Sequence, residues 1–204
     1  MGTVFRHIAA LTLWTLSIVP AQAAVTITFW SHELGNSFPH AFFTLRGIPD
    51  SGGVAVDSTF GFTAKTVSPA LLFGPVAGKI DVARRSYVSS SDAQFSVTMT
   101  DAQYGDVLGL VDAWSEGKPD GVYRLGDHNC VTFVKEAARR VGLVGLDRPG
   151  LMKKPRSYLK AIQTENAGRV TAIGMHGNVW LNAVVGEALV SQRTEAISHA
   201  EPAQ

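Results

Sequence analysis

Segments with the pattern of β-strands come first in this chain, and segments with helical periodicity follow them. Short stretches rich in β-branched and aromatic residues occupy 25–33, 40–47, 54–62, 78–88 and 93–100, with turn residues between them. Consecutive strands joined by short turns pair in antiparallel fashion. This order therefore predicts an α+β domain in which a small antiparallel sheet packs against helices.

Three segments after the last of these strands have helical patterns of different strength. Thr100 and Gln103 form a capping box ahead of apolar residues at helical spacing, which predicts a helix over 101–115. A shorter and weaker helical pattern covers 154–163. Another amphipathic pattern, over 178–190, favours one more helix near the end of the chain.

The sequence from Asn129 to Gly142 carries the clearest helix signals. Asn129 is a favoured N-cap, so the helix is expected to begin at Cys130 and to stop at Gly142. Glu136 and Arg140 stand four residues apart, the spacing of an ion pair along a helix. Cys130 is thus placed in the first turn of a well-defined helix.

The N-terminus has the pattern of a secretory signal peptide. A short apolar run over 8–19 follows basic residues, and small residues precede Ala24, which predicts cleavage of residues 1–23. The run is shorter than the roughly 18 residues that span a bilayer, so we expect no stable membrane anchor. We expect a secreted or periplasmic protein with a folded domain over 24–166 and a C-terminal extension over 167–204, partly helical with a disordered end.

The charge balance excludes one class of partner. The 204 residues include 18 basic and 17 acidic side chains, giving a formal net charge of +1, and no basic run. A nucleic-acid-binding domain normally shows a clustered positive charge. We therefore expect no nucleic-acid partner.

Cys130 is the single cysteine of the chain, which matters in an exported protein. Exported proteins usually use cysteines in pairs as disulfides, and here no internal partner exists. A buried inert thiol, an intermolecular disulfide and a reactive thiol all remain open. The position at a helix N-terminus favours the thiolate and so the reactive thiol.

A nucleophilic thiol needs an imidazole that takes and returns its proton. The candidates in the mature chain are His32, His40, His128, His176 and His199. His40 opens a predicted strand and is our first choice, His32 is the second, and His128 is better placed to line the site. His176 would require strands after Cys130, where we expect none, and His199 lies in the predicted disordered end.

The stretches "HAFFTL" at residue 40 and "NCVTFVKEAARRVGL" from residue 129 resemble the circularly permuted papain-like (NlpC/P60-like) superfamily of cysteine hydrolases. This superfamily includes lecithin:retinol acyltransferase-like proteins. The resemblance implies Cys130 as nucleophile and His40 as base, with a polar residue on the following strand that orients the imidazole. It also implies a peptide or cell-wall amide as substrate, with a lipid acyl ester or amide second. The lecithin:retinol acyltransferase pattern has a histidine where Thr132 stands, which argues against lipid acyl transfer.

The orienting residue depends on the register of the predicted hairpin. A turn centred at Asp50 pairs residue 40 with residue 60, which places Ser58 on the face of His40 and Asp57 on the opposite face. A shift of one residue reverses the two. A carboxylate is the better partner for an imidazolium, so Asp57 is preferred, with Ser58 as the alternative.

Other functions compete with catalysis by a Cys–His dyad. Asp127, His128 and Cys130 lie close in sequence, but they do not make a complete tetrahedral ligand set, and we expect neither a metal nor a cofactor. Asn129, His128, Ser58 and His32 are candidates for substrate contacts beside the dyad, and the backbone N–H of Cys130 is a candidate oxyanion donor. A binding module that kept the fold without the chemistry is the alternative of a different class.

Overall fold

The computed structural model describes residues 24–33 and 38–184. Within that part of the chain, the strands form one antiparallel sheet in the order β6-β4-β3-β2-β1-β5-β7. They are β1 (Val25–His32), β2 (His40–Gly47), β3 (Val56–Ala64), β4 (Val76–Asp81), β5 (Asp92–Met99), β6 (Val122–Tyr123) and β7 (Thr171–His176). The expected signal peptide and the expected disordered end lie outside the described residues.

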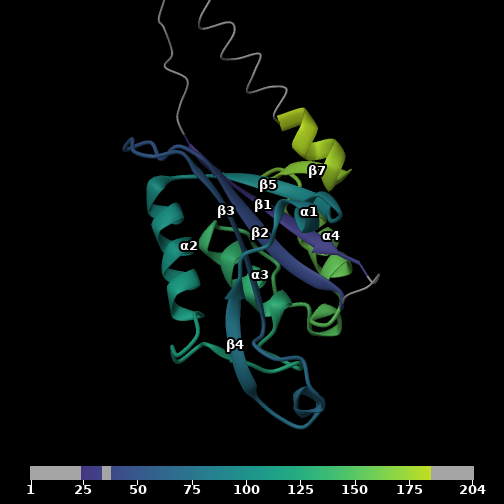
Figure 1. Cartoon of the computed structure of the whole chain (residues 1–204). Helices are drawn as coiled ribbons and strands as arrows, with labels where there is room; N and C mark the ends of the chain where they lie inside the picture. Colours follow the sequence, from purple (N-terminus) through teal and green to yellow (C-terminus); the bar gives the residue numbers. More distant parts are fainter. Residues whose placement is uncertain (1–23, 34–37, 185–204) are drawn as a thin grey trace, which may run out of the picture.

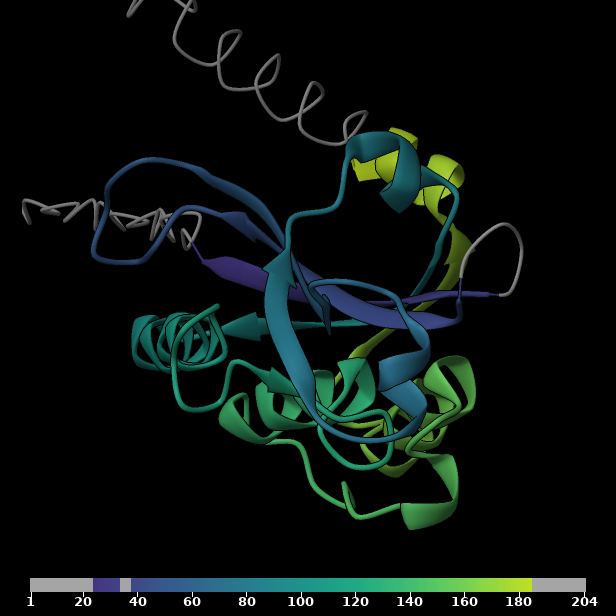
Figure 2. The ribbon, with the colours of Figure 1, turned by 60° about the horizontal axis from the view of Figure 1, so that its bottom comes forward.

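Helices cover both faces of this sheet (Figures 1 and 2). They are α1 (Arg85–Ser89), α2 (Asp101–Ala113), α3 (Cys130–Arg140) and α4 (Pro155–Glu165), with 3-10 turns η1 (Pro69–Leu72) and η2 (Pro149–Leu151) and a helical segment at 177–184. Figure 2 shows α2, α3 and α4 below the sheet, and α1 with residues 177–184 above it. None of the helices in the described ranges is long and apolar enough to cross a membrane.

The main core lies between the sheet and the helices α2, α3 and α4. Alternate residues of the strands point to this side, so Phe43 of β2 and Phe95 of β5 are fully buried there. Phe43 stacks on Phe133 of α3 with ring centroids 5.3 Å apart. This contact fixes α3 against the middle of the sheet.

A second, smaller core lies on the other face. Trp30 and Phe42 point to this side, where Val88 of α1 and Leu181 of the last helical segment cover them. The indole of Trp30 stacks on the phenyl ring of Phe42 with centroids 5.9 Å apart. The sheet is therefore sandwiched, with the larger helical layer on the side of α3.

The predicted α+β class and the helix starts are confirmed. Thr100 and Gln103 form the expected capping box of α2, and Asn129 caps α3. The expected strand over 78–88 is wrong in its second half, because the chain leaves β4 at Asp81 and forms α1 instead.

The expectation of no strand after Cys130 is also wrong. Residues 171–176 form β7, which pairs with β5 at the edge of the sheet, so the sheet continues into the expected C-terminal extension. β7 is largely exposed, its pairing has an irregularity opposite Ala93 and Phe95, and Gly174 adopts a positive φ of 63°. A strand of this kind carries little hydrophobic alternation for sequence reasoning to detect.

The expected register between the second and third strands is wrong as well. The structure pairs Phe42 with Gly61 and Gly47 with Val56, whereas the prediction paired residue 40 with residue 60. The loop between Gly47 and Val56 is longer than the tight turn centred at Asp50 that the prediction assumed. Within the described residues the pairing of β2 with β3 begins at Phe42, so His40 has no partner on β3.

Candidate active site

The N-terminus of α3 is tightly capped. The Asn129 side-chain oxygen accepts hydrogen bonds from the backbone N–H groups of Val131 at 2.8 Å and Thr132 at 3.2 Å. The Asn129 side-chain nitrogen donates to the carbonyls of Leu125 and Met152, each at 3.0 Å. One buried side chain thus ties together the helix start and the loops on either side of it.

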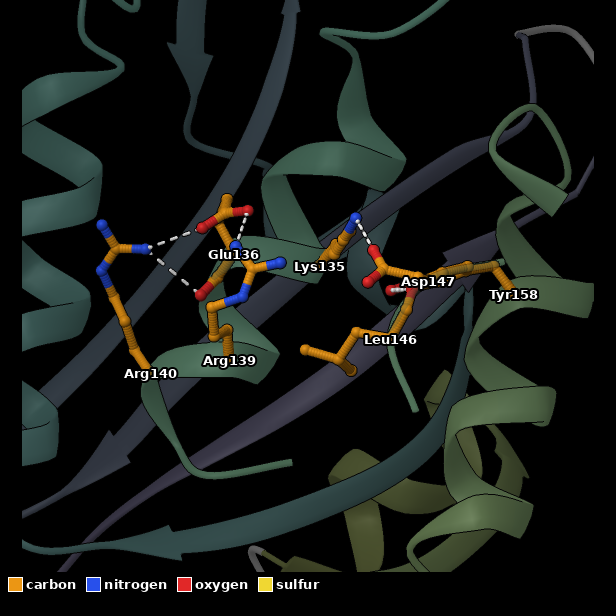
Figure 3. A network of polar contacts seen from close by, with 7 residues as sticks. All are labelled: Lys135, Glu136, Arg139, Arg140, Leu146, Asp147 and Tyr158. Atoms are coloured by element: carbon orange, nitrogen blue, oxygen red, sulfur yellow. Dashed lines mark hydrogen bonds and ion pairs between the residues drawn. The ribbon is translucent and has the colours of Figure 1, made fainter. Parts of the chain in front are cut away.

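The other end of α3 is held by the polar network of Figure 3. Lys135 donates to Asp147 at 2.5 Å, and the hydroxyl of Tyr158 in α4 donates to the Leu146 carbonyl at 3.1 Å. Glu136 accepts from Arg140 at 3.5 Å, the pair expected from their spacing, and it also bonds Arg139. α3 is therefore tied to the loop that follows it through Lys135 and to the sheet through Phe133.

Cys130 itself is buried, with 7% of its surface exposed. Burial raises the pKa of the thiol to about 11, although backbone N–H groups of Ala41, Val131 and Cys130 itself favour the thiolate and offset part of the effect. The N–H groups at the helix N-terminus act as expected, in favour of the thiolate, but burial has the larger effect on the pKa. Removal of the sulfur from water outweighs the nearby N–H groups.

His40 stands at the first position of β2 on the opposite side of the sheet from α3. Ala41 and Phe43 point toward α3, so the alternation of the strand turns His40 to the side of Phe42. The imidazole stacks on the Phe42 ring with centroids 6.1 Å apart. Burial lowers the pKa of His40 to about 4, while the carboxylate of Asp81 acts in the opposite direction.

The two side chains line one cavity beside a fork in the sheet. β2 and β3 are paired only as far as Phe42 and Gly61, and beyond that point β3 continues beside β4. His40 and Cys130 both line the cavity of about 880 Å³ that opens at this fork, which we call the Cys130 cavity. Among the described residues no hydrogen bond joins the thiol to the imidazole, and such contacts are often long before substrate binds.

The mouth of the Cys130 cavity is apolar. Phe38, Val67, Leu72 and Leu125 line it from three different loops and remain exposed, Phe38 at 74% and Leu72 at 73%. Lys65, Lys79 and Lys153 also line it, and among the described lining residues Asp81 is the one carboxylate. Large apolar side chains left in water around a cavity are a common feature of ligand-binding grooves.

His32 and His128 lie near the cavity without lining it. His32 is the register partner of His40 on β1, but its ring stacks on Tyr87 at 4.4 Å and its Nδ1 hydrogen-bonds the Ser91 hydroxyl at 3.0 Å. His128 stacks on Trp114 at 3.9 Å, and its Nε2 hydrogen-bonds the Asp120 carbonyl at 2.9 Å. Both rings are held by structural contacts.

Asp57 and Ser58 are not brought to His40. Asp57 is paired with Arg46, its side chain 3.1 Å from the guanidinium, six residues along β2 from His40. At the rise of a strand this separation is about 20 Å. Both residues line a different cavity on the sheet, so the assignment of Asp57 as orienting residue is wrong for geometric reasons.

Asp81 is the carboxylate that the structure does bring near His40. It is the last residue of β4, it lines the Cys130 cavity, and it is the register partner of Gly61. Sequence reasoning missed it because it lies two strands away from β2 and 41 positions along the chain. The glycine opposite it, Gly61 within "TFGFT", is the signal that could have pointed there.

His176 lies at the far edge of the sheet. In β7 its Nδ1 hydrogen-bonds Asp92 at 2.9 Å, and Asp92 also pairs with Arg156 at 3.6 Å. His176 does not line the Cys130 cavity.

The backbone N–H groups at this helix start differ in their acceptors. Those of Val131 and Thr132 donate to the Asn129 side chain, whereas that of Cys130 lies beside its own sulfur and favours the thiolate. The amide of Asn129 is fully used in capping, so it supports the helix and cannot also bind an oxyanion. Within the same ranges there is no group of three His, Cys, Asp or Glu side chains that could hold a metal ion.

Comparison of the chain with known protein families, with characterised proteins and with solved structures gives no match.

Proposed function

We propose that this protein is an exported cysteine hydrolase of the circularly permuted papain-like type that cleaves peptide or cell-wall amide bonds. The observation that carries the proposal is the shared cavity of Cys130 and His40 at the fork between β2 and β3. An apolar cavity with a nucleophile and a base on its wall is the usual form of an acyl-transfer site. The order of a histidine-bearing strand before a cysteine-bearing helix supports the same fold type.

The reaction begins with the neutral pair. The sulfur of Cys130 attacks the substrate carbonyl carbon while its proton passes to His40, and the carbonyl oxygen becomes an oxyanion that the Cys130 N–H stabilises. His40 then protonates the leaving amine as the C–N bond breaks, which leaves a thioester on Cys130. Water, deprotonated by His40, hydrolyses the thioester and restores the thiol.

The test uses the mature protein with cell-wall peptide fragments and intact-mass analysis. We expect an acyl adduct on Cys130 and product release, both abolished in Cys130→Ala. His40→Ala should lower turnover by roughly 10²–10⁴-fold, the usual contribution of a general base. His32→Ala should cost on the order of tenfold or less, and His176→Ala at the far edge serves as the control.

Two results would contradict this proposal. Turnover that survives Cys130→Ala would exclude the nucleophile, and turnover that survives His40→Ala but not His32→Ala would exclude the base. Fragments that bind with no adduct and no product would instead support a binding module that uses the same cavity.

A lipid acyl ester or amide is the second candidate substrate, favoured by the apolar mouth of the cavity. Phe38 and Leu72 would contact a long acyl chain, and the three lining lysines would suit an anionic group. A series of p-nitrophenyl esters from short to long chains tests it. If the substrate is a lipid, kcat/KM rises with chain length and Leu72→Asp removes that rise, whereas Val54→Asp, on the exposed connection between β2 and β3, leaves it intact.

A further inference from the structure

Gly61 leaves a gap in β3 that the His40 ring occupies. A Cβ added at Gly61 would lie 2.5 Å from Nε2 of His40 and 3.3 Å from Cβ of Phe42. Gly61 is buried, and its side of the strand is the side of His40 and Phe42. Any other residue at this position would therefore push the imidazole off β3.

Asp81 stands on the far side of this gap. Gly61 pairs with Phe42 on one side and with Asp81 on the other, so the three residues form one row across β2, β3 and β4. Residues paired in this way point to the same face of the sheet. Gly61 puts no side chain into this row between the imidazole and the carboxylate.

We propose that Asp81 is the positioning residue of the dyad, which orients His40 across the Gly61 gap and stabilises the imidazolium formed when His40 accepts the Cys130 proton. The inference rests on the proposed function of the Cys130 cavity. Asp81 on β4 takes the role that was expected from the sequence for Asp57 on β3, and Gly61 lies between Asp81 and His40.

The other groups around His40 do not offer this role. On β1, His32 is a base whose positive form would oppose the imidazolium, and on α1 Tyr87 offers a phenol hydroxyl rather than a carboxylate. On α3, Cys130 is the proton donor. On β4, Lys79 lies 3.7 Å from Asp81 and weakens its field at His40 without removing its negative charge. Asp81 is the carboxylate among the charged residues that line the cavity.

The test compares Asp81→Asn with Asp57→Asn, since Asp57 is an exposed carboxylate on the same face of the sheet with no contact to His40. The histidine titrations are followed by NMR in the full-length mature protein, and His40→Gln assigns the signal of His40. We expect Asp81→Asn to lower the pKa of His40 and Asp57→Asn to leave it unchanged. This measurement does not depend on turnover.

Kinetics supply the second readout. Asp81→Asn should lower kcat by roughly 10–100-fold with little change in KM, and Asp81→Glu should restore part of the loss. Gly61→Ala should lower kcat at least as much, whereas Gly74→Ala, at a site where a Cβ meets nothing within 4 Å, should leave it unchanged.

The inference is overturned if Asp81→Asn and Asp57→Asn give the same His40 titration and the same kcat. That failure differs from failure of the proposed function, in which Cys130→Ala would retain turnover. Should the proposed function fail, the His40 titration alone still decides whether Asp81 acts on the imidazole.

Discussion

At the scale of single residues, burial sets the ground state of the proposed dyad as thiol and neutral imidazole. It raises the pKa of Cys130 to about 11 and lowers that of His40 to about 4, so each group is held in its uncharged form near neutral pH. A thiolate–imidazolium pair formed before substrate binds would have to be stabilised in a site of low polarity. Proton transfer coupled to the attack on substrate avoids that cost.

The raised pKa predicts a slow thiol in the substrate-free protein. We expect iodoacetamide to modify Cys130 at pH 7 at least ten times more slowly than free cysteine, because few molecules carry the thiolate. The rate should rise with pH up to about 11. Alkylation followed by mass spectrometry measures it, with the denatured protein as control. A rate above that of free cysteine would show that the thiolate is formed in advance.

The lowered pKa of His40 predicts a loss of stability in acid. From its ordinary pKa of 6.5 down to about 4, the unfolded chain protonates residue 40 while the folded protein does not, so stability falls as pH falls. The loss should be on the order of 2 kcal/mol from this residue. The His40→Gln variant should not show this loss of stability. Urea unfolding of both proteins at pH 7 and pH 4.5 gives the difference, and equal losses in the two would refute the argument.

At the scale of elements, the sequence predicted the helix caps, which depend on near neighbours in the chain, but not the register of the strands. The caps at Thr100 and Asn129 involve neighbours three residues apart or fewer, and both are confirmed. The register of β2 with β3 depends on a long connection, and a three-residue error there placed Ser58 and Asp57 closer to His40 than they are. Asp81 could not be found from the β2–β3 hairpin, because it lies on β4, on the other side of β3 from His40.

The N-cap of α3 should therefore matter more than that of α2. Asn129→Ala removes a cap and also the partly buried hydrogen bonds to the carbonyls of Leu125 and Met152, so we expect a loss of roughly 2–4 kcal/mol. Thr100→Ala at the exposed cap of α2 should cost about 1 kcal/mol. Chemical denaturation compares the two, and equal losses would mean that the loop contacts of Asn129 add nothing.

At the scale of the whole molecule, the last strand of the sheet, β7, follows both proposed catalytic residues in the sequence. β7 covers the open edge of β5, and residues 177–184 bring Leu181 onto Trp30 and Val88. The smaller core on that face therefore depends on the end of the described chain. The expected boundary at residue 166 would cut through the folded unit.

Truncation tests this dependence. Deleting residues 167–204 removes β7 and uncovers Trp30 and Val88, so the loss should reach on the order of 4 kcal/mol or more, a fall of about 10 °C in Tm. Deleting residues 193–204, which lie outside the described structure and carry no apolar face in the sequence, should change Tm by no more than about 2 °C. Thermal unfolding followed by circular dichroism separates the two. If the longer deletion melted like the intact protein, the fold would end before β7, and the sheet edge at β5 would need no cover.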